Sequence, residues 1–315
     1  MIKKMMLTIA LATMTSLVAS AQGLPTPDGI DLSGSWVGRK FTDAIGTSFG
    51  TGGGPTPVEY QGIPLNDSGR AFALTYSQSQ LSMPERMCAM NAPTYIAIGP
   101  MGLRIWPEFD MLTGVTTAWI IGVGASEDTV PIRIWMDGRP HPSGNAAHDK
   151  SGFTTGVWVD DVLTTYTTHM PQGVIRRNGV PSSDRATMTI RFSRHDDILT
   201  LTARIDDPVY LTEPYYLSRD FVLTKTPLNP TTSPCTVVDE GIEAEHIPHY
   251  KVGQNPFVDE QTKLFGIPME AVLGGAETAY PEFRKKIKDK YQRPDHCVNV
   301  PPGACGRTGA FPPIK

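Results

Sequence analysis

The stretch ATMTIRFSRHDDILTLTARID, residues 186–206, decides the fold class. Apolar and polar side chains alternate on both sides of the turn His195-Asp196-Asp197. The two apolar rows are Ala186, Met188, Ile190 and Phe192, and Leu199, Leu201, Ala203 and Ile205. A period of two is the pattern of a β-strand with one buried face. Two such strands joined by a short polar turn predict an antiparallel hairpin.

Other stretches share this composition, which is rich in threonine, β-branched and aromatic residues and is bounded by turn residues. They are residues 94–98, 103–108, 115–123, 131–137, 154–159, 162–169 and 215–226. Asp160-Asp161 joins two of them as a second hairpin. The protein is therefore predicted to be mainly β and antiparallel, a barrel or a sandwich of eight to ten strands.

Both ends of the chain differ from this central part. Residues 1–21 combine Lys3 and Lys4, an apolar run and the small residues Ala19-Ser20-Ala21, which predicts a cleaved signal peptide and a periplasmic or secreted protein. A retained N-terminal anchor is the alternative. No later stretch is long and apolar enough for a membrane span. We expect the β domain over residues 30–226 and, over 227–315, a C-terminal extension that packs on it.

Short helices are expected outside the strands. A first helix covers residues 71–81 and is capped by Asn66 or Asp67. Within the extension, the helices cover residues 259–265, 268–273 and 281–291, the last with proline in its first turn. The remainder of the extension is rich in proline and glycine and is expected to be irregular.

Four cysteines remain for an oxidising compartment, namely Cys88, Cys235, Cys297 and Cys305. An even count in an exported protein predicts two disulfides. Cys297 and Cys305 are near neighbours in the sequence, so that Cys88 would pair with Cys235. A structural metal site is the alternative, but the sequence has no Cys-x-x-Cys pair.

Charge and motifs exclude several classes of function. The net charge is −4 and the basic residues are mixed with acidic ones, so a nucleic-acid partner is not expected. No phosphate-binding glycine motif stands between a strand and a helix, and no cofactor is expected. A small organic molecule is the expected partner, and the sequence does not indicate an oligomeric state.

Residues 133–142, RIWMDGRPHP, end a predicted strand and begin a loop, where sites commonly lie. Arg133, Trp135 and Asp137 share one face of this strand. Arg104, Trp106 and Glu108 repeat the pattern in an earlier strand. Because tryptophans exposed among charges are uncommon, we expect these rows to line a polar lumen. The alternative is an outer surface with cross-strand ion pairs and indoles that cover the arginine stems.

Histidine suits proton transfer near neutral pH. We expect His169 to act as a general base that Asp137 or Glu108 orients, with Arg139 and Arg176 as anion clamps. The predicted catalytic set is His169, Asp137, Arg139, His141 and Arg176, and the predicted substrate-binding set is Trp106, Glu108, Trp135, Arg177 and Asp184. A zinc site of His141, His148 and His169 is an alternative without a standard ligand spacing.

Gly34-Ser35-Trp36, which opens the strand-rich region, resembles the Gly-x-Trp signature of lipocalins. The resemblance implies a lipocalin-like barrel in which Trp36 plugs the closed end and a late arginine, for which Arg219 is the candidate, packs on it. Residues 134–142, 152–158, 167–169, 176–184 and 207–214 look like a widespread family of exported bacterial proteins. That family has no established activity, so this resemblance implies the layout of the domain and no mechanism.

Three hypotheses for the function follow. The first is a cofactor-free hydrolase, lyase or isomerase that acts on a small organic molecule in the barrel. The second is a non-catalytic carrier of a hydrophobic molecule, with Trp106, Trp119, Trp135 and Trp158 as its walls. The third is a structural or interaction module of the cell envelope, with a filled barrel.

Overall fold

The computed structural model describes residues 29–39, 58–77, 92–96, 102–123, 131–176, 178–227 and 249–291. The predicted signal peptide and all four cysteines lie outside these ranges, so both remain predictions. The strands are β1 (Gly34–Gly38), β2 (Leu103–Phe109), β3 (Thr116–Val123), β4 (Ile132–Trp135), β5 (Phe153–Val159), β6 (Val162–Thr168), β7 (Gly173–Arg176), β8 (Val180–Ser182), β9 (Thr187–His195), β10 (Ile198–Asp206) and β11 (Tyr215–Thr224). The helices are α1 (Asp67–Ala73), α2 (Pro93–Ile96), α3 (Glu260–Phe265), α4 (Met269–Val272), the 3₁₀ helix η3 (Ala276–Ala279) and α5 (Pro281–Ile287).

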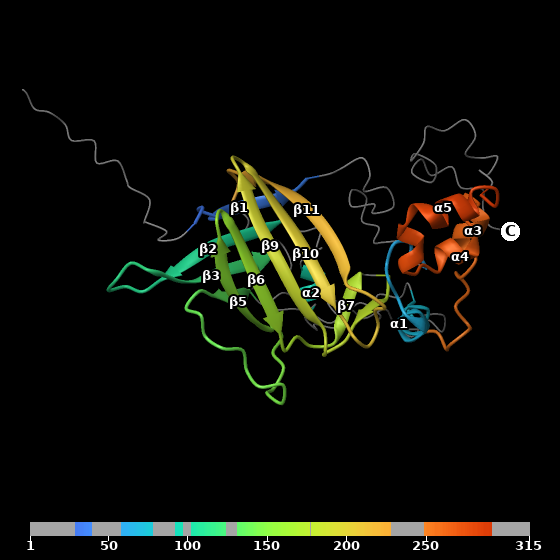
Figure 1. Ribbon diagram of the computed structural model, residues 1–315, viewed down its shortest axis with the longest axis horizontal. Helices are drawn as coiled ribbons and strands as arrows, with labels where there is room; N and C mark the ends of the chain where they lie inside the picture. Colours follow the sequence, from blue (N-terminus) through green and yellow to red (C-terminus); the bar gives the residue numbers. More distant parts are fainter. Residues whose placement is uncertain are drawn as a thin grey trace, which may run out of the picture.

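Nine strands form a closed barrel in the order β1-β11-β10-β9-β6-β5-β4-β3-β2, while β7 and β8 form a separate two-stranded sheet (Figure 1). The prediction of a mainly β barrel of eight to ten strands is confirmed. Closure leaves no free sheet edge in the barrel wall. Neighbouring strands are antiparallel except for β4 and β5, which pair in parallel.

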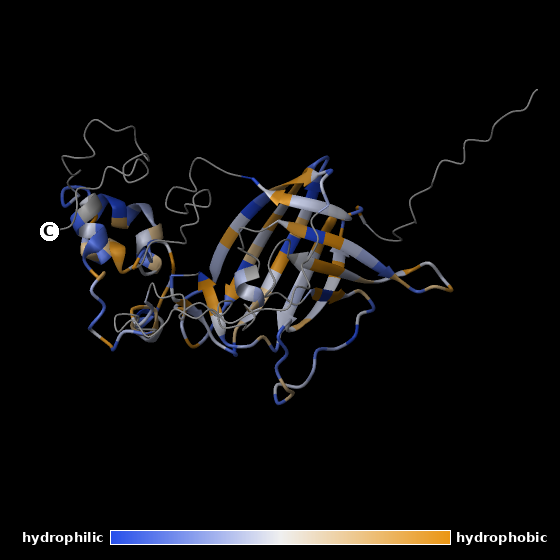
Figure 2. Cartoon of the chain, turned by 180° about the vertical axis from the view of Figure 1, so that it is seen from behind, coloured by the Kyte–Doolittle hydropathy of each residue, from blue (hydrophilic) through white to orange (hydrophobic). Residues whose placement is uncertain are grey.

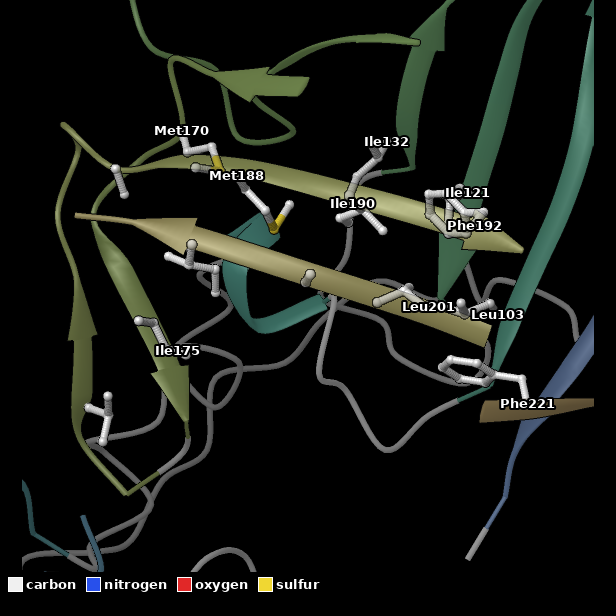
Figure 3. Close-up of a cluster of buried hydrophobic side chains, with 14 of the residues drawn as sticks. Leu103, Ile121, Ile132, Met170, Ile175, Met188, Ile190, Phe192, Leu201 and Phe221 are labelled. Atoms are coloured by element: carbon white, nitrogen blue, oxygen red, sulfur yellow. The ribbon is translucent and has the colours of Figure 1, made fainter. Parts of the chain in front are cut away.

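The hairpin of residues 186–206 forms as predicted. His195 pairs with Ile198, so that Asp196 and Asp197 make the turn, and Asp196 has a positive φ of 51°. Aspartate tolerates this left-handed conformation better than most residues do. Both predicted apolar rows point into the barrel, where Phe192 and Leu201 are opposite one another. The hairpin therefore supplies a large part of the core (Figure 3).

The barrel interior is built from the apolar rows of the other strands as well. Leu103, Ile121, Ile132 and Phe221 point toward the same core as Phe192 (Figure 3). Each is at most 5% exposed. Burial of a side chain of this size stabilises the fold by about 1.5–3 kcal/mol. Because strand side chains alternate, the other row of each of these strands faces outward.

Trp36 lies at the start of the barrel and is fully buried, and its indole N–H donates to the Leu32 carbonyl (3.0 Å). The guanidinium over its ring belongs to Arg194, at 5.2 Å from the ring centre. The choice of Arg219 for this role was wrong. Arg219 lies on the inner row of β11, over the ring of Phe221.

Two predicted elements differ from the structure. Residues 94–98 were expected to be a strand, but Pro93–Ile96 form helix α2. Pro93 favours this start because its fixed φ suits the first helical position. The first predicted helix begins earlier and ends earlier than expected, at residues 67–73, and Asn66 is its cap, accepting a hydrogen bond from the Gly69 amide (2.8 Å).

The C-terminal helices gather beside α1 (Figure 1). The Tyr60 amide donates to the Val272 carbonyl (3.1 Å), and the Gly62 amide donates to the Thr278 hydroxyl (2.7 Å). Tyr280 also donates to Glu213, in the loop after β10 (2.8 Å). The described part of the extension is thus attached mainly through residues 58–77. No helix within the described ranges is long and apolar enough to cross a membrane.

Candidate functional site

The charged and tryptophan-bearing rows of β2 and β4 face the outside of the barrel. Ile132 and Ile134 are buried, whereas Arg133 is exposed and Trp135 is half-buried. The expected polar lumen lined by these rows is therefore wrong. Only one row of a strand can face the interior, and burial of guanidinium groups there carries a large desolvation cost that the apolar row avoids.

The outer wall shows the ion pairs and ring contacts of the alternative interpretation. Arg133 pairs with Glu108 across β3. Arg139 pairs with Asp137, with its Nε 2.9 Å from a carboxylate oxygen. The guanidinium of Arg139 lies 3.6 Å from the centre of the Trp135 ring, and that of Arg133 lies 4.9 Å from it. The Trp135 indole thus contacts two guanidinium groups on the surface, and the Trp106 indole contacts that of Arg104, 5.7 Å from its ring centre.

The parallel pairing of β4 and β5 explains why this wall carries a site. A two-residue turn cannot join parallel strands, so the chain must make a longer excursion before it enters β5. Residues 136–152 make this excursion, and Gly138, Pro140 and Pro142 keep the segment out of regular structure. Arg139, paired with Asp137, is thereby carried onto Trp135 of β4. His141 is carried onto the outer surface of β5 and β6, and Ser143 to His169 at the end of β6.

His141 and His169 are joined there by a continuous chain of hydrogen bonds. Thr155 Oγ1 is 2.9 Å from His141 Nε2, and Thr168 Oγ1 is 2.8 Å from His141 Nδ1. The same Thr168 hydroxyl is 2.7 Å from His169 Nδ1, and His169 Nε2 is 2.9 Å from the Ser143 carbonyl oxygen. The chain therefore has five members, in the order Thr155, His141, Thr168, His169 and Ser143.

We call this five-membered chain the relay. The Ser143 carbonyl at one end determines which atom donates and which accepts in each hydrogen bond of the relay. A carbonyl oxygen only accepts, so His169 must donate from Nε2, and in a neutral ring its Nδ1 then accepts. Thr168 must donate to that nitrogen and accept from His141 Nδ1–H. His141 Nε2 is then an acceptor for the Thr155 hydroxyl. The geometry thus assigns the Nδ1–H tautomer to His141 and the Nε2–H tautomer to His169.

The surroundings of His141 favour its neutral form. Burial, and secondly the neighbouring His169, lower the pKa of His141 below its usual value of 6.5. Burial disfavours the charged imidazolium, and a second histidine adds repulsion when both rings carry a proton. His141 also contacts the rings of Phe153 and Tyr166, with centres 5.0 Å and 5.1 Å away.

His169 is held in an unusual backbone conformation at the end of β6. Its φ is +54°, a left-handed value that is uncommon for a residue other than glycine. The Asp149 amide donates to the His169 carbonyl (3.0 Å), which attaches the excursion to this point. Strained positions of this kind concentrate at functional sites.

His148 stands next to the relay and is not part of it. Its Nδ1 donates to the Met170 carbonyl (2.8 Å), and its ring centre is 5.5 Å from that of His169. Within the described residues, no group of three or more histidine, cysteine, aspartate or glutamate side chains is placed to hold a metal ion. The alternative of a zinc site built from His141, His148 and His169 is therefore not supported.

The structure brings part of the predicted site together and separates the rest. His141, His169, Asp137, Arg139, Trp106, Trp135 and Glu108 all lie on the outer wall of β2–β6 or on the excursion that covers it. The Arg176 guanidinium instead donates to the Glu59 carbonyl (3.4 Å). Asp184 is exposed before β9, and Arg177 lies outside the described residues.

The expected orienter of His169 is also corrected. Asp137 binds Arg139, and Glu108 binds Arg133, so these carboxylates are engaged elsewhere. Instead of these carboxylates, the Thr168 hydroxyl and the Ser143 carbonyl orient the His169 ring. The alternation of β6 offered a signal for Thr168, because Tyr166 and Thr168 share the face opposite the buried Thr165 and Thr167. The contribution of Thr155 depends on the pairing of β5 with β4 and could not be read from spacing.

Comparisons with known proteins found no relative of this chain. No family model, no curated protein and no solved structure matches the chain. The resemblance to an exported bacterial family stays a prediction, and the function has to be argued from the site itself.

Proposed function

We propose that the protein acts on a small organic molecule at the outer wall of β4–β6, by acid–base chemistry that needs no cofactor. The reaction classes are hydrolysis, elimination and isomerisation. The observation that supports this proposal is the relay from Thr155 to the Ser143 carbonyl, because it joins two histidines through a single hydroxyl. The proposal places the protein in the periplasm or outside the cell, as residues 1–21 predict.

His141 is the proton acceptor in this mechanism. A substrate hydroxyl or acidic C–H group that replaces the Thr155 hydroxyl meets a lone pair on His141 Nε2. When His141 takes the proton there, its Nδ1 proton passes to Thr168, and the Thr168 proton passes to His169 Nδ1. His141 is neutral again, and His169 carries the positive charge while its Nε2–H remains bound to Ser143. Return of the proton along the same path supplies the acid for the second half of the reaction.

The surroundings of His141 suggest the kind of molecule that binds. Trp135 and Tyr166 are the neighbours of Thr155 on the adjacent strands, and Tyr166 is 44% exposed. These rings offer flat apolar contact, and Arg139 above Trp135 offers a cation. A planar molecule with a carboxylate or a developing oxyanion fits this combination.

The test is a panel of small esters, enolisable ketones and β-substituted acids, followed by NMR from pH 5 to pH 9. The wild type, His141→Gln, Thr168→Val and Asp137→Asn are compared. We expect His141→Gln to abolish turnover and Thr168→Val to reduce kcat about 10²–10⁴-fold, the usual size of a proton-transfer contribution. Asp137→Asn releases the Arg139 guanidinium from its ion pair, so it should lower KM for an anionic substrate and leave kcat nearly unchanged. Equal kcat in the wild type and His141→Gln on a turned-over substrate contradicts the proposal.

A carrier of an apolar molecule is a second candidate function, because apolar side chains line the barrel interior. Trp119 is buried on the inner row of β3, and Trp158 packs against the core from β5. The walls of such a site are therefore these two tryptophans, since Trp106 and Trp135 face outward. Native mass spectrometry of protein from its original host decides this candidate. A co-purified apolar molecule that stays chemically unchanged on incubation supports a carrier, and an empty barrel contradicts it.

A further inference from the structure

The hairpin of β2 and β3 extends away from the barrel and ends in an apolar tip (Figures 1 and 2). Met111 and Leu112 at the turn are 94% and 96% exposed. Val115, just after the turn, is 46% exposed, and Phe109 ends β2 immediately before it. Two adjacent large apolar side chains in full contact with water are unusual on a protein surface and mark an interaction site.

The turn that carries these side chains is fixed by its own hydrogen bonds. One carboxylate oxygen of Asp110 accepts from the amides of Leu112 (2.9 Å) and Thr113 (2.8 Å). The Gly114 amide donates to the Asp110 carbonyl (2.8 Å), and the Asp110 amide donates to the Val115 carbonyl (2.9 Å). Met111 and Leu112 are therefore presented outward by an ordered turn.

We propose that this tip inserts into the surface of a zwitterionic phospholipid membrane. The size of the tip supports a lipid partner. A stable protein interface uses about 20–30 residues on each side, and this narrow convex tip offers only Met111, Leu112 and Val115, with Phe109 partly buried behind them. A membrane requires no complementary surface, because insertion depends on the transfer of the apolar side chains alone.

The residues behind the tip fit the level of the lipid headgroups. Trp106 lies three residues before Phe109 in β2, a distance of about 10 Å along the strand. Interfacial elements insert about 5–10 Å, so when Met111 and Leu112 are inserted, Trp106, and Trp135 two strands away, lie toward the water side of the headgroup region. Tryptophan is enriched at the membrane–water interface, and the arginines near these rings are held in ion pairs with Glu108 and Asp137.

Charge near the tip selects the type of membrane. Asp110 is the one ionisable residue of the turn 110–115, and its carboxylate would lie at the headgroups. Anionic lipids repel this group, whereas the choline of phosphatidylcholine attracts it. The insertion therefore depends on apolar transfer, and increasing salt should weaken it little.

The test measures co-sedimentation of the full chain with phosphatidylcholine vesicles. The tip variant is Met111→Gln with Leu112→Gln, and the matched control is Val252→Gln, since Val252 is also exposed (75%) but lies in the C-terminal segment. All proteins carry the same residues 1–21, so only the difference between the variants reports on the tip. We expect the tip variant to lose about tenfold to a hundredfold in partition coefficient per substituted side chain, and the control to bind as the wild type does.

Equal partition of the tip variant and the control overturns the proposal. So does a dimer in sedimentation velocity that the tip variant converts to a monomer while vesicle binding stays the same, because a second copy would then cover the tip. Replacement of a third of the lipid by phosphatidylglycerol should not increase binding. An increase of tenfold or more would show attraction by basic residues and would contradict insertion of the tip as the cause.

Discussion

Substitution Thr168→Val tests the relay directly. Valine has the shape of threonine and suits a strand equally well, so the change removes the hydroxyl and little else. The two hydrogen bonds that are lost join Thr168 Oγ1 to His141 Nδ1 (2.8 Å) and to His169 Nδ1 (2.7 Å). Each bond contributes about 0.5–1.5 kcal/mol net. We therefore expect the free energy of unfolding to fall by about 1–3 kcal/mol.

The control for this variant is Thr164→Val. Thr164 lies on the same outer face of β6, and no hydrogen bond joins its side chain to another residue in the described part of the chain. Urea unfolding followed by far-UV circular dichroism compares the three proteins at pH 7.5, where His141 is neutral. Equal losses in the two variants would refute the view that the hydroxyl of Thr168 holds the excursion to the wall.

Nitrogen-15 NMR of the imidazole rings provides the second measurement on the same protein. In the wild type we expect His141 to carry its proton on Nδ1 and His169 to carry its proton on Nε2. Most free histidines prefer Nε2–H, so the assignment for His141 is specific to the relay. A neutral His141 that is protonated on Nε2 would refute the direction of the chain, whatever the stability data show. In Thr168→Val, His141 should return to the Nε2–H form.

Three further predictions concern stability. The lowered pKa of His141 favours the neutral ring in the folded state, so its contribution to the free energy of unfolding is complete above pH 6.5 and is lost as the pH falls through the lowered pKa. Urea unfolding between pH 7 and pH 5 should show this loss of stability, and His141→Gln should show less of it. Gly156→Ala places a methyl group 2.6 Å from an Ile134 side-chain carbon and should lower the free energy of unfolding by about 1–3 kcal/mol, whereas Gly144→Ala, which meets nothing within 4 Å, should not. Gly274→Ala combines a φ of +72° with a clash against the backbone of residue 60, so limited proteolysis should cut the C-terminal segment faster than in the wild type.

The strands could be predicted because their pattern is local. The hairpins at Asp160-Asp161 and Asp196-Asp197, and the alternating rows of β9 and β10, follow from period-two alternation and turn residues alone. The Asn66 cap was readable for the same reason. The segment 94–98 failed because its threonine and isoleucine suit a strand, while Pro93 and the hydrogen bond from Thr94 to Ser182 (3.1 Å) hold a helix there.

The orientation of the rows was harder to predict because two physical arguments compete. Tryptophan beside arginine suggests a sheltered face, yet β2 and β4 each also have a fully apolar row that gains more from burial. In β4 the apolar row of Ile132 and Ile134 faces the interior, and Trp135 remains half-buried under two guanidinium groups on the outside. Exposed indoles are tolerated where long cationic side chains cover them.

The assembly of the site depends on a feature that no local pattern encodes. Had β4 and β5 been antiparallel, a short turn would have joined them and the histidines of the excursion would have lain beyond the barrel edge. The parallel pairing of Trp135 with Thr155 instead obliges residues 136–152 to fold back over the wall, which brings His141 between Thr155 and Thr168. The same pairing sets Trp135 beside Thr155. The parallel arrangement of β4 and β5 therefore brings the Trp135 ring, with Arg139 above it, next to His141. In the proposed mechanism, Trp135 of β4 contacts the substrate, and His141 of the segment that follows β4 deprotonates it. A change in the length of residues 136–152 should therefore abolish activity while the barrel stays folded.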